Sequence, residues 1–151
     1  MNKLILSKSS NCFLHTTYPC IIKVNNMTFN SSLQYYVKTK QERFDKTNNT
    51  LSTKIMNTND PEELQYISRD IKNYNNHLWN ISHKYSVMLD ANIYKFSQNN
   101  DLKSKLLNTY GLKIIYSNNN DKIWGFDNTM RGLNLLGQSL NETRHIIKTQ
   151  Y

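Results

Sequence analysis

The 151-residue sequence predicts one α+β domain, in which a few short strands are combined with several helices. Short runs rich in β-branched and aromatic residues lie at 20–24, 27–29 and 112–117. Elsewhere apolar residues recur at helical spacing, most clearly at 31–44, 60–72, 81–96 and 133–148. No internal repeat and no linker divides the chain, so we expect a single domain.

The first third of the chain is expected to be extended and then helical. Asn25 and Asn26 separate the apolar runs at 20–24 and 27–29, and asparagine tolerates the positive φ angles of a tight turn. This segment therefore predicts a β-hairpin. Residues 47–59 are rich in Asn, Thr and Ser without a clear period, so we expect a loop there or a weak extension of the preceding helix.

A helix is predicted to begin after Ser31 or Ser32, because either hydroxyl can cap it. Four of its residues share one face by their spacing: Leu33, Val37, Lys40 and Phe44. A lysine in an apolar stripe is partly desolvated, which lowers its pKa towards the range of an amine nucleophile or proton donor. The alternative is a lysine whose stem packs on the stripe while its ammonium group reaches solvent.

The middle of the chain predicts two helices. Asp60 supplies an N-cap, Pro61 suits the first helical position, and Glu62 and Glu63 complement the helix dipole, which predicts a helix running to about Lys72. A longer helix follows a polar break. Its apolar residues keep helical spacing: Ile81, Tyr85, Met88, Leu89, Ile93 and Phe96.

The C-terminal third is expected to hold a short helix, a strand and a final helix. Asp101 can cap the short helix, which stops at Gly111. Residues 112–117 predict the strand. The last helix is predicted from Leu133 to Lys148, with these residues facing inward: Leu136, Leu140, Ile146 and Ile147.

Composition excludes several classes of protein. No run of about 18 apolar residues exists, and the N-terminal apolar run is too short for a signal peptide, so we expect neither a membrane protein nor a secreted one. Cys12 and Cys20 lack the spacing of a zinc site and are too few for a disulfide framework, which favours a reducing, cytoplasmic compartment. The four histidines show no ligand spacing and are expected on the surface: His15, His77, His83 and His145.

The net charge of +8 at pH 7 favours phosphorylated partners. The lysines are scattered, however, and the abundance of Asn and Lys is typical of an AT-rich genome. A nucleic-acid binder, whose affinity would fall steeply with salt, is therefore a hypothesis that we do not favour. Nothing in the sequence predicts a metal ion, a cofactor or a membrane partner.

A glycine-rich segment is the first candidate site. Three of the four glycines, Gly125, Gly132 and Gly137, fall within thirteen residues. Charged groups and an indole lie among them: Asp121, Trp124, Asp127 and Arg131. Such a loop can bring backbone N–H groups and a helix N-terminus to an anion, while the indole offers a flat surface for a base or sugar. The alternative is a tight turn in which the tryptophan fills the core.

Residues 13–22 read FLHTTYPCII, and residues 29–40 read FNSSLQYYVKTK. The first segment resembles the FLSNFYPSPI opening, and the second the WPTSEHYFQAQK helix, of the YbiA-like, or NADAR, family. The resemblance covers residues 13–147. The later motifs VM…KF, LL.T, D..WG and GKN.LG..L…R agree in spacing and identity with Val87, Met88, Lys95, Phe96, Leu106, Leu107, Thr109, Asp121, Trp124, Gly125, Gly132, Asn134, Gly137, Leu140 and Arg144. The resemblance implies one YbiA-like domain over residues 1–151, with a small mixed sheet surrounded by several helices.

The resemblance also implies N-glycosidic chemistry. Family members are described as N-glycosidases that cleave the first two intermediates of riboflavin biosynthesis, and relatives act on ADP-ribose attached to nucleobases. Cleavage at C1 of the ribose builds oxocarbenium-like charge that a carboxylate can stabilise. The leaving nitrogen must be protonated, or the sugar captured by a nucleophile. Lys40 matches the lysine of the family's first helix.

Departures from the family fall where the chemistry would take place. Leu33 stands where the family has the glutamate of its first helix, and Tyr116 replaces the glutamate of its LVE strand. His15 and Thr16 replace the SN of the opening motif. A leucine cannot stabilise a cation or activate water, so an active enzyme would need a carboxylate from another position.

The leading hypothesis is an N-glycosidase that hydrolyses the N-glycosidic bond of early riboflavin-biosynthesis intermediates, which are phosphoribosylamino-pyrimidines. Lys40 is expected to be the catalytic amine and Asp121 the charge stabiliser, with Asp127 and then Glu42 as alternative carboxylates. The residues expected to bind substrate are Tyr35, Trp124, Gly125, Asp127, Gly132, Asn134 and Gly137.

Two alternatives stay open. The replacements at Leu33 and Tyr116 favour a catalytically degenerate module that binds ADP-ribose or a nucleotide. The family also includes the chemistry of an ADP-ribosyl glycohydrolase acting on modified nucleobases. In each case the expected partner is a small phosphorylated N-riboside.

Overall fold

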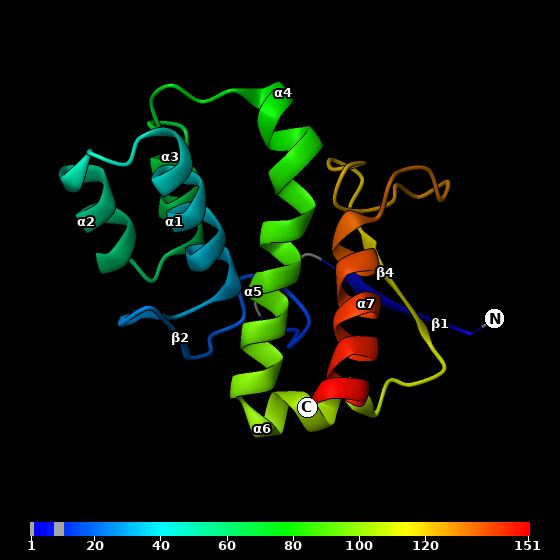
Figure 1. Cartoon of the computed structure of the whole chain (residues 1–151). Helices are drawn as coiled ribbons and strands as arrows, with labels where there is room; N and C mark the ends of the chain where they lie inside the picture. The colour runs from blue at the N-terminus through cyan, green and yellow to red at the C-terminus, as the bar shows by residue number, and fades with distance from the viewer. Residues whose placement is uncertain (1, 8–10) are drawn as a thin grey trace.

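A central helix separates two helical groups in the computed structural model, which describes residues 2–7 and 11–151. This helix is α5 (Lys84–Gln98), and it packs on both neighbouring groups (Figure 1). On one side lie α1 (Ser32–Phe44), α2 (Asn49–Asn57) and α3 (Pro61–Ser68). On the other side lies α7 (Leu135–Gln150), which covers the strand β4 (Lys113–Ser117).

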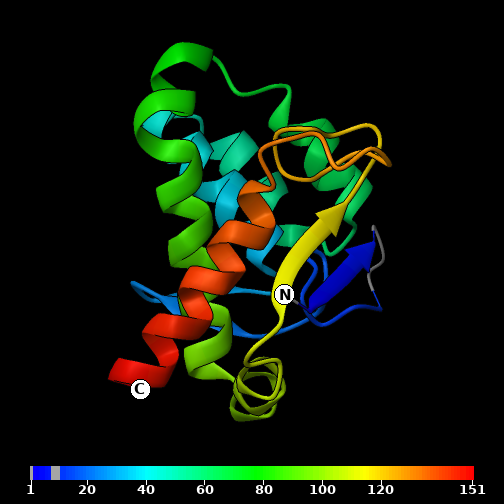
Figure 2. The ribbon, with the colours of Figure 1, turned by 90° about the vertical axis from the view of Figure 1, so that its right-hand side faces the viewer.

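The strands form two separate pairs. β1 (Lys3–Ser7) runs parallel to β4, with Leu4 opposite Ile114, and Figure 2 shows the two side by side. β2 (Ile22–Val24) and β3 (Met27–Phe29) form the antiparallel hairpin predicted from the sequence. Asn25 and Asn26, with φ of 50° and 65°, supply its turn. The predicted α+β fold class is therefore confirmed, with its strands distributed over one parallel and one antiparallel pair.

The first helices follow the sequence signals with one correction. Ser31 caps α1 by accepting a hydrogen bond from the backbone N–H of Gln34, as expected. The predicted loop or helix extension at 47–59 is wrong, because a separate helix, α2, forms there. Asn48 caps it, and Leu51 and Ile55 lie on one face, buried against α1 and α3.

Three boundaries differ from the prediction. α3 begins after Asp60 as expected but ends at Ser68, before Lys72. α6 (Asn100–Leu107) begins one residue before Asp101, so Asp101 lies in the first turn and does not cap the helix. The last helix begins at Leu135, because Asn134 has a left-handed φ of 50° that ends the preceding loop.

A π-helical turn precedes the central helix. α4 (Asn76–Leu78) leads into η1 (Trp79–His83), which continues directly into α5. A π turn holds one extra residue, so it rotates the faces of the preceding segment relative to those of α5. Trp79 is buried, whereas Ile81 is 69 % exposed, although its spacing had placed it on the apolar face of the predicted helix.

Two apolar cores result from this arrangement. The larger lies between α5, α6, α7 and the parallel strand pair, and its members include Phe96, Leu106, Ile114 and Leu140. The smaller lies among α1, α2 and α3 and includes Val37 and Ile55. Within residues 2–7 and 11–151, no helix is long and apolar enough to cross a lipid bilayer.

Candidate active site

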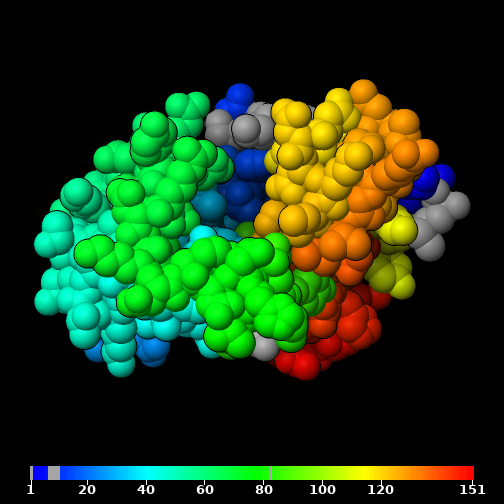
Figure 3. Space-filling model, turned by 90° about the horizontal axis from the view of Figure 1, so that it is seen from above, coloured from blue at the N-terminus to red at the C-terminus, as the bar shows by residue number. Residues whose placement is uncertain are grey.

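A cleft of about 730 Å³ opens between the two cores. In Figure 3 it is the hollow between the green segment, which includes α3, and the yellow-to-orange loop after β4, with the blue N-terminal segment inside it. Its lining comes from segments far apart in the sequence, and the residues with chemical interest are His15, Leu33, Tyr36, Tyr116, Asp121 and Trp124. The sequence had predicted the last two as site residues.

Asp121 and Trp124 lie in the same turn of the loop after β4. The Oδ1 atom of Asp121 accepts hydrogen bonds from the backbone N–H groups of Ile123 (3.1 Å) and Trp124 (2.9 Å). Its Oδ2 atom makes no hydrogen bond or ion pair within the described part of the chain. The Trp124 ring packs edge-on against Tyr36, with 5.7 Å between ring centroids. The cleft therefore has a carboxylate oxygen beside a flat indole.

His15 and Tyr116 meet on the cleft wall although 101 residues separate them in sequence. His15 Nε2 lies 3.4 Å from the Tyr116 hydroxyl, and the rings pack edge to face. The Asn118 side chain donates to the same hydroxyl over 3.1 Å. His15 is only 6 % exposed, so the expectation of a surface histidine is wrong at this position. Burial is the main reason that the pKa of Tyr116 is raised, with a smaller contribution from the charge of Asp121.

The positions that depart from the family pattern gather in this cleft. Leu33, His15, Thr16 and Tyr116 all line it. Leu33 brings no ionisable group to the wall, and Tyr116 and His15 bring a phenol and an imidazole. The replacements relative to the family pattern therefore share one cavity. No single motif could show this, because the residues lie on different elements.

Lys40 lies two turns beyond Leu33 on α1, on the face that also brings Tyr36 to the cleft. The Lys40 Nζ atom lies 3.3 Å from the Ser68 hydroxyl and 4.2 Å above the centre of the Tyr74 ring. Partial burial lowers the pKa of Lys40, and the positive charge of Lys84 lowers it further. The predicted desolvation is thus present, while Nζ is directed towards α3 and does not line the cleft.

Lys84 links this region to the cleft. Its Nζ atom lies 6.0 Å from the centre of the Trp124 ring. Burial lowers the pKa of Lys84, and the charge of Asp121 opposes that shift. Lys84 therefore places positive charge next to the Asp121 end of the cleft, and Lys40 is close enough to Lys84 for the two charges to interact.

The glycines of the candidate loop hold it against β4 and α7. A Cβ atom on Gly125 would lie 2.6 Å from the Tyr116 carbonyl oxygen, and one on Gly132 would lie 2.2 Å from the Gly125 carbonyl oxygen. On Gly137 it would lie 2.5 Å from the Ile114 carbonyl oxygen. None of the three lines the cleft. Their close backbone contacts explain why glycine is needed at these positions.

The start of α7 is also occupied by protein groups. Asn134 is 2 % exposed, and its side chain accepts from the Tyr116 backbone N–H and donates to the Ile114 carbonyl. The N–H groups of Leu135 and Leu136 donate to the carbonyls of Ile123 and Trp124. These N–H groups, which the sequence suggested for phosphate binding, instead fix the loop that carries Asp121.

Two further predicted residues lie outside the cleft lining. Asp127 accepts from Thr129 and from the backbone N–H of Arg131 and lies 3.3 Å from Lys122, and these hydrogen bonds hold its pKa well below the usual range. Tyr35 packs edge-on between Phe29 and Tyr94, and burial raises its pKa. Their assigned role in substrate binding stays a prediction.

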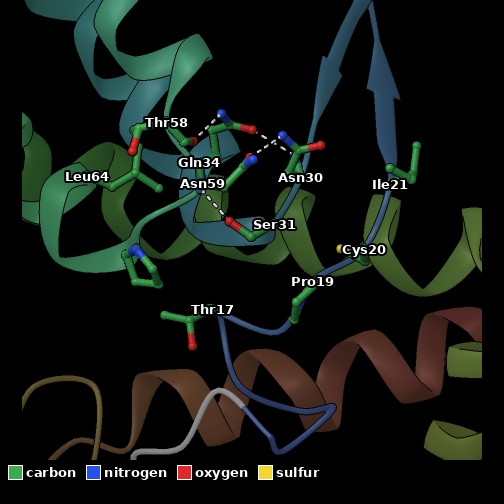
Figure 4. Close-up of a pocket in the computed structure, with 11 residues that line it drawn as sticks. Thr17, Pro19, Cys20, Ile21, Asn30, Ser31, Gln34, Thr58, Asn59 and Leu64 are labelled. Atoms are coloured by element: carbon green, nitrogen blue, oxygen red, sulfur yellow. Dashed lines mark hydrogen bonds between the residues drawn. The ribbon is translucent and has the colours of Figure 1, made fainter.

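A second pocket of about 470 Å³ adjoins the cleft at Thr17 and Pro61 (Figure 4). The Asn30 amide donates to Asn59, and the Gln34 amide donates to the carbonyls at the end of α2. The residues that line it carry no charge, and burial raises the pKa of its thiol, Cys20. The acid and base groups therefore belong to the cleft.

Comparison with known proteins places this architecture in a family. Residues 2–148 match the NADAR domain. N-glycosidase R617 of Acanthamoeba polyphaga mimivirus is 34 % identical over 102 residues, covering 60 % of this chain and 59 % of that protein. Protein irg-1 of Caenorhabditis elegans is 28 % identical over 113 residues, covering 66 % of this chain and 53 % of that protein. The chain thus spans less than two thirds of the length of these curated relatives.

The fold agrees with a solved relative. The NMR structure of the Escherichia coli protein YbiA superposes on this chain with a TM-score of 0.79 at 26 % sequence identity, covering all of this chain and 90 % of that one. The family match and the fold agree over nearly the whole chain. This protein belongs to the NADAR domain family.

Proposed function

We propose that this protein is an N-glycosidase that hydrolyses the bond between a ribose and a nitrogen atom. The observation that carries the proposal is the Asp121 carboxylate beside the Trp124 ring, in the cleft of a NADAR domain. As the glycosidic bond breaks, positive charge develops on C1 and the ring oxygen of the ribose. A fixed carboxylate stabilises that charge more strongly in the transition state than in the ground state.

The proposed substrates are small phosphorylated N-ribosides, and among them the phosphoribosylamino-pyrimidines of early riboflavin biosynthesis. Trp124 would stack on the leaving base, and Asp121 would face the ribose. Lys84 carries positive charge beside this end of the cleft, which suits a phosphate group. Lys40 is the proposed catalytic amine where the sugar is captured by an amine before water: its lowered pKa favours the neutral form, and its Nζ atom would have to turn from Ser68 into the cleft to reach the sugar carbon.

A binding module without turnover is the second candidate. Leu33 favours it, because this side chain lines the cleft at the position where the family has a glutamate. Such a protein would keep the cavity and bind ADP-ribose or a nucleotide without cleaving it. Restoring the carboxylate should then restore release of the sugar.

The test is to incubate the protein with the two early riboflavin intermediates and with ADP-ribosylated guanosine, following release of ribose 5-phosphate or ADP-ribose. Wild type is compared with Asp121→Asn and Leu33→Glu. Asparagine keeps the oxygen that accepts from the Ile123 and Trp124 N–H groups but loses the negative charge. We expect Asp121→Asn to lower kcat by about 100-fold or more, the size typical for loss of one electrostatic stabiliser.

Asp101→Asn is the matched control, because its exposed carboxylate lies on α6, where it pairs with Lys105. It should leave turnover unchanged. Equal activity of Asp121→Asn and wild type would overturn the role of Asp121. Release by Leu33→Glu alone would select the binding module, and release by neither protein would contradict the N-glycosidase proposal.

A further inference from the structure

The hydrogen bonds around the Tyr116 hydroxyl determine which group can accept its phenolic proton. The hydroxyl has two partners within the described residues, His15 Nε2 at 3.4 Å and Asn118 Nδ2 at 3.1 Å. All three residues line the cleft. Whether each partner donates or accepts decides what Tyr116 can do with its own proton.

Backbone N–H groups orient both partners. The Thr17 N–H donates to His15 Nδ1 over 3.2 Å, and the Thr17 hydroxyl oxygen lies 2.8 Å from the same atom. The backbone N–H can only donate and the hydroxyl can rotate to donate, so in the neutral ring Nδ1 accepts both and Nε2 carries the proton. The Asn120 N–H donates to Asn118 Oδ1 over 3.0 Å, which turns the NH₂ group of Asn118 towards Tyr116. Both groups that face the phenol oxygen are therefore donors.

We propose that Tyr116 is the general acid of the cleft, donating its phenolic proton to the nitrogen that leaves the ribose. This inference rests on the proposed N-glycosidase function. A phenol oxygen that accepts two hydrogen bonds can still donate one, and because Tyr116 lines the cleft, a nitrogen atom bound there can accept that proton. Burial keeps the pKa of Tyr116 above its ordinary value, so the proton is present at neutral pH.

The proton and electron balance closes with one water molecule as the co-reactant. The C1–N bond breaks with both electrons on nitrogen, which takes the Tyr116 proton, while Asp121 faces the oxocarbenium ion. The His15 Nε2–H and Asn118 NH₂ groups stabilise the phenolate that remains. Water then adds to C1 through its oxygen and returns a proton to the phenolate, which restores the starting state.

Contacts from neighbouring elements hold Tyr116 and His15 in place. Tyr116 is 5 % exposed, and its ring rests edge-on against His15. Lys95 in turn holds the loop of His15, donating to the His15 carbonyl over 2.9 Å. The donor array is therefore held from both β4 and α5.

The test is Tyr116→Phe, which removes one oxygen and keeps the ring. Two substrates are compared: a phosphoribosylamino-pyrimidine, whose nitrogen must be protonated to leave, and nicotinamide mononucleotide, whose pyridine leaves as a neutral molecule without a proton. We expect kcat for the first to fall by about 100-fold or more and kcat for the second to change by less than about fivefold. A purely structural role would lower both equally.

Tyr85→Phe is the matched control, since its hydroxyl bonds Glu142 outside the cleft. It should leave both rates unchanged. Equal losses on the two substrates, or no loss on the first, would overturn the role of Tyr116. If wild type cleaves neither substrate, the proposed function fails. The Kd for ribose 5-phosphate, measured by titration of wild type and Tyr116→Phe, then tests whether the Tyr116 hydroxyl donates to a bound ligand. A roughly tenfold weaker Kd in Tyr116→Phe then supports donation to a bound ligand, and an unchanged Kd rejects it.

Discussion

Lys40 illustrates how much a single side chain depends on its surroundings. The helical spacing of Leu33, Val37 and Lys40 predicted a partly desolvated lysine, and the structure places it half-buried. Burial is the larger cause of its lowered pKa, and the positive charge of Lys84 is the smaller one. The second cause depends on the packing of α1 against α5, which the spacing within one helix does not contain.

Replacing Lys40 distinguishes two roles for this side chain, a neutral amine that attacks the sugar and a fixed positive charge. If its neutral amine attacks the sugar, both Lys40→Ala and Lys40→Arg should lose about 100-fold or more in kcat, because a guanidinium keeps its proton at every accessible pH. Wild-type kcat should rise with pH as the amine deprotonates and level off above a pKa that lies below the usual 10.5. Steady-state kinetics across the alkaline range measure both effects.

Lys54→Ala, an exposed lysine on α2, is the control for a lost surface charge and should match wild type. Wild-type turnover in Lys40→Arg would reject the amine role and leave Lys40 as a charge beside the cleft.

At the scale of elements, the start of α7 and the loop before it form one unit with β4. Asn134 bonds two backbone groups of β4, and the first N–H groups of α7 bond carbonyls of the loop. Gly137 lies at a close contact of this unit, where a Cβ would come within 2.4 Å of the Asn134 side chain and 2.5 Å of the Ile114 carbonyl oxygen. The position of Asp121 in the cleft therefore depends on residues that do not line it.

Gly137→Ala should disturb this contact. The added methyl group must displace either the Asn134 side chain or the Ile114 carbonyl, and we expect the free energy of unfolding to fall by about 1–3 kcal/mol. Denaturant unfolding measures the change. His145→Ala, an exposed position on the same helix, should change stability by less than about 0.5 kcal/mol. Equal stability of the two variants would show that α7 can shift without cost.

For the molecule as a whole, the buried Lys95 ties folding to pH. Lys95 is 0 % exposed, donates to the His15 carbonyl, and has its pKa lowered to about 8 by burial. In the unfolded chain the same group titrates near 10.5. Between these values the unfolded state binds more protons than the folded state, so the free energy of unfolding contributed by Lys95 rises with pH.

The variant Lys95→Met should lose this contribution. We expect the difference in unfolding free energy, wild type minus variant, to be constant below pH 8 and to increase by at most about 1.4 kcal/mol per pH unit above it. Denaturant titrations at several pH values measure the difference, and the tyrosines and Cys20 titrate in both proteins. A difference that is the same at pH 7 and pH 10 would contradict the assignment.

Local signals determined much of the fold, because caps, turns and helical spacing act over a few residues. Asn25 and Asn26 gave the hairpin turn, and Ser31 and Asp60 gave the starts of two helices. α2 escaped detection because its two apolar residues, Leu51 and Ile55, make a weak pattern in a polar segment and are buried only by packing on α1 and α3.

The sequence by itself determined the fold class, most element starts and, through its motifs, the resemblance to the NADAR domain family. It also drew attention to Asp121 and Trp124, which line the cleft, because one glycine-rich segment contains both. Tertiary structure alone decided that His15 and Tyr116 share a cleft with them. It also decided that Asn134 bonds the backbone of β4 and that Gly137 lets α7 pack closely on that strand. The physical reason is that hydrogen bonds between distant segments depend on how β4, α5 and α7 pack, and no spacing along the chain records that packing.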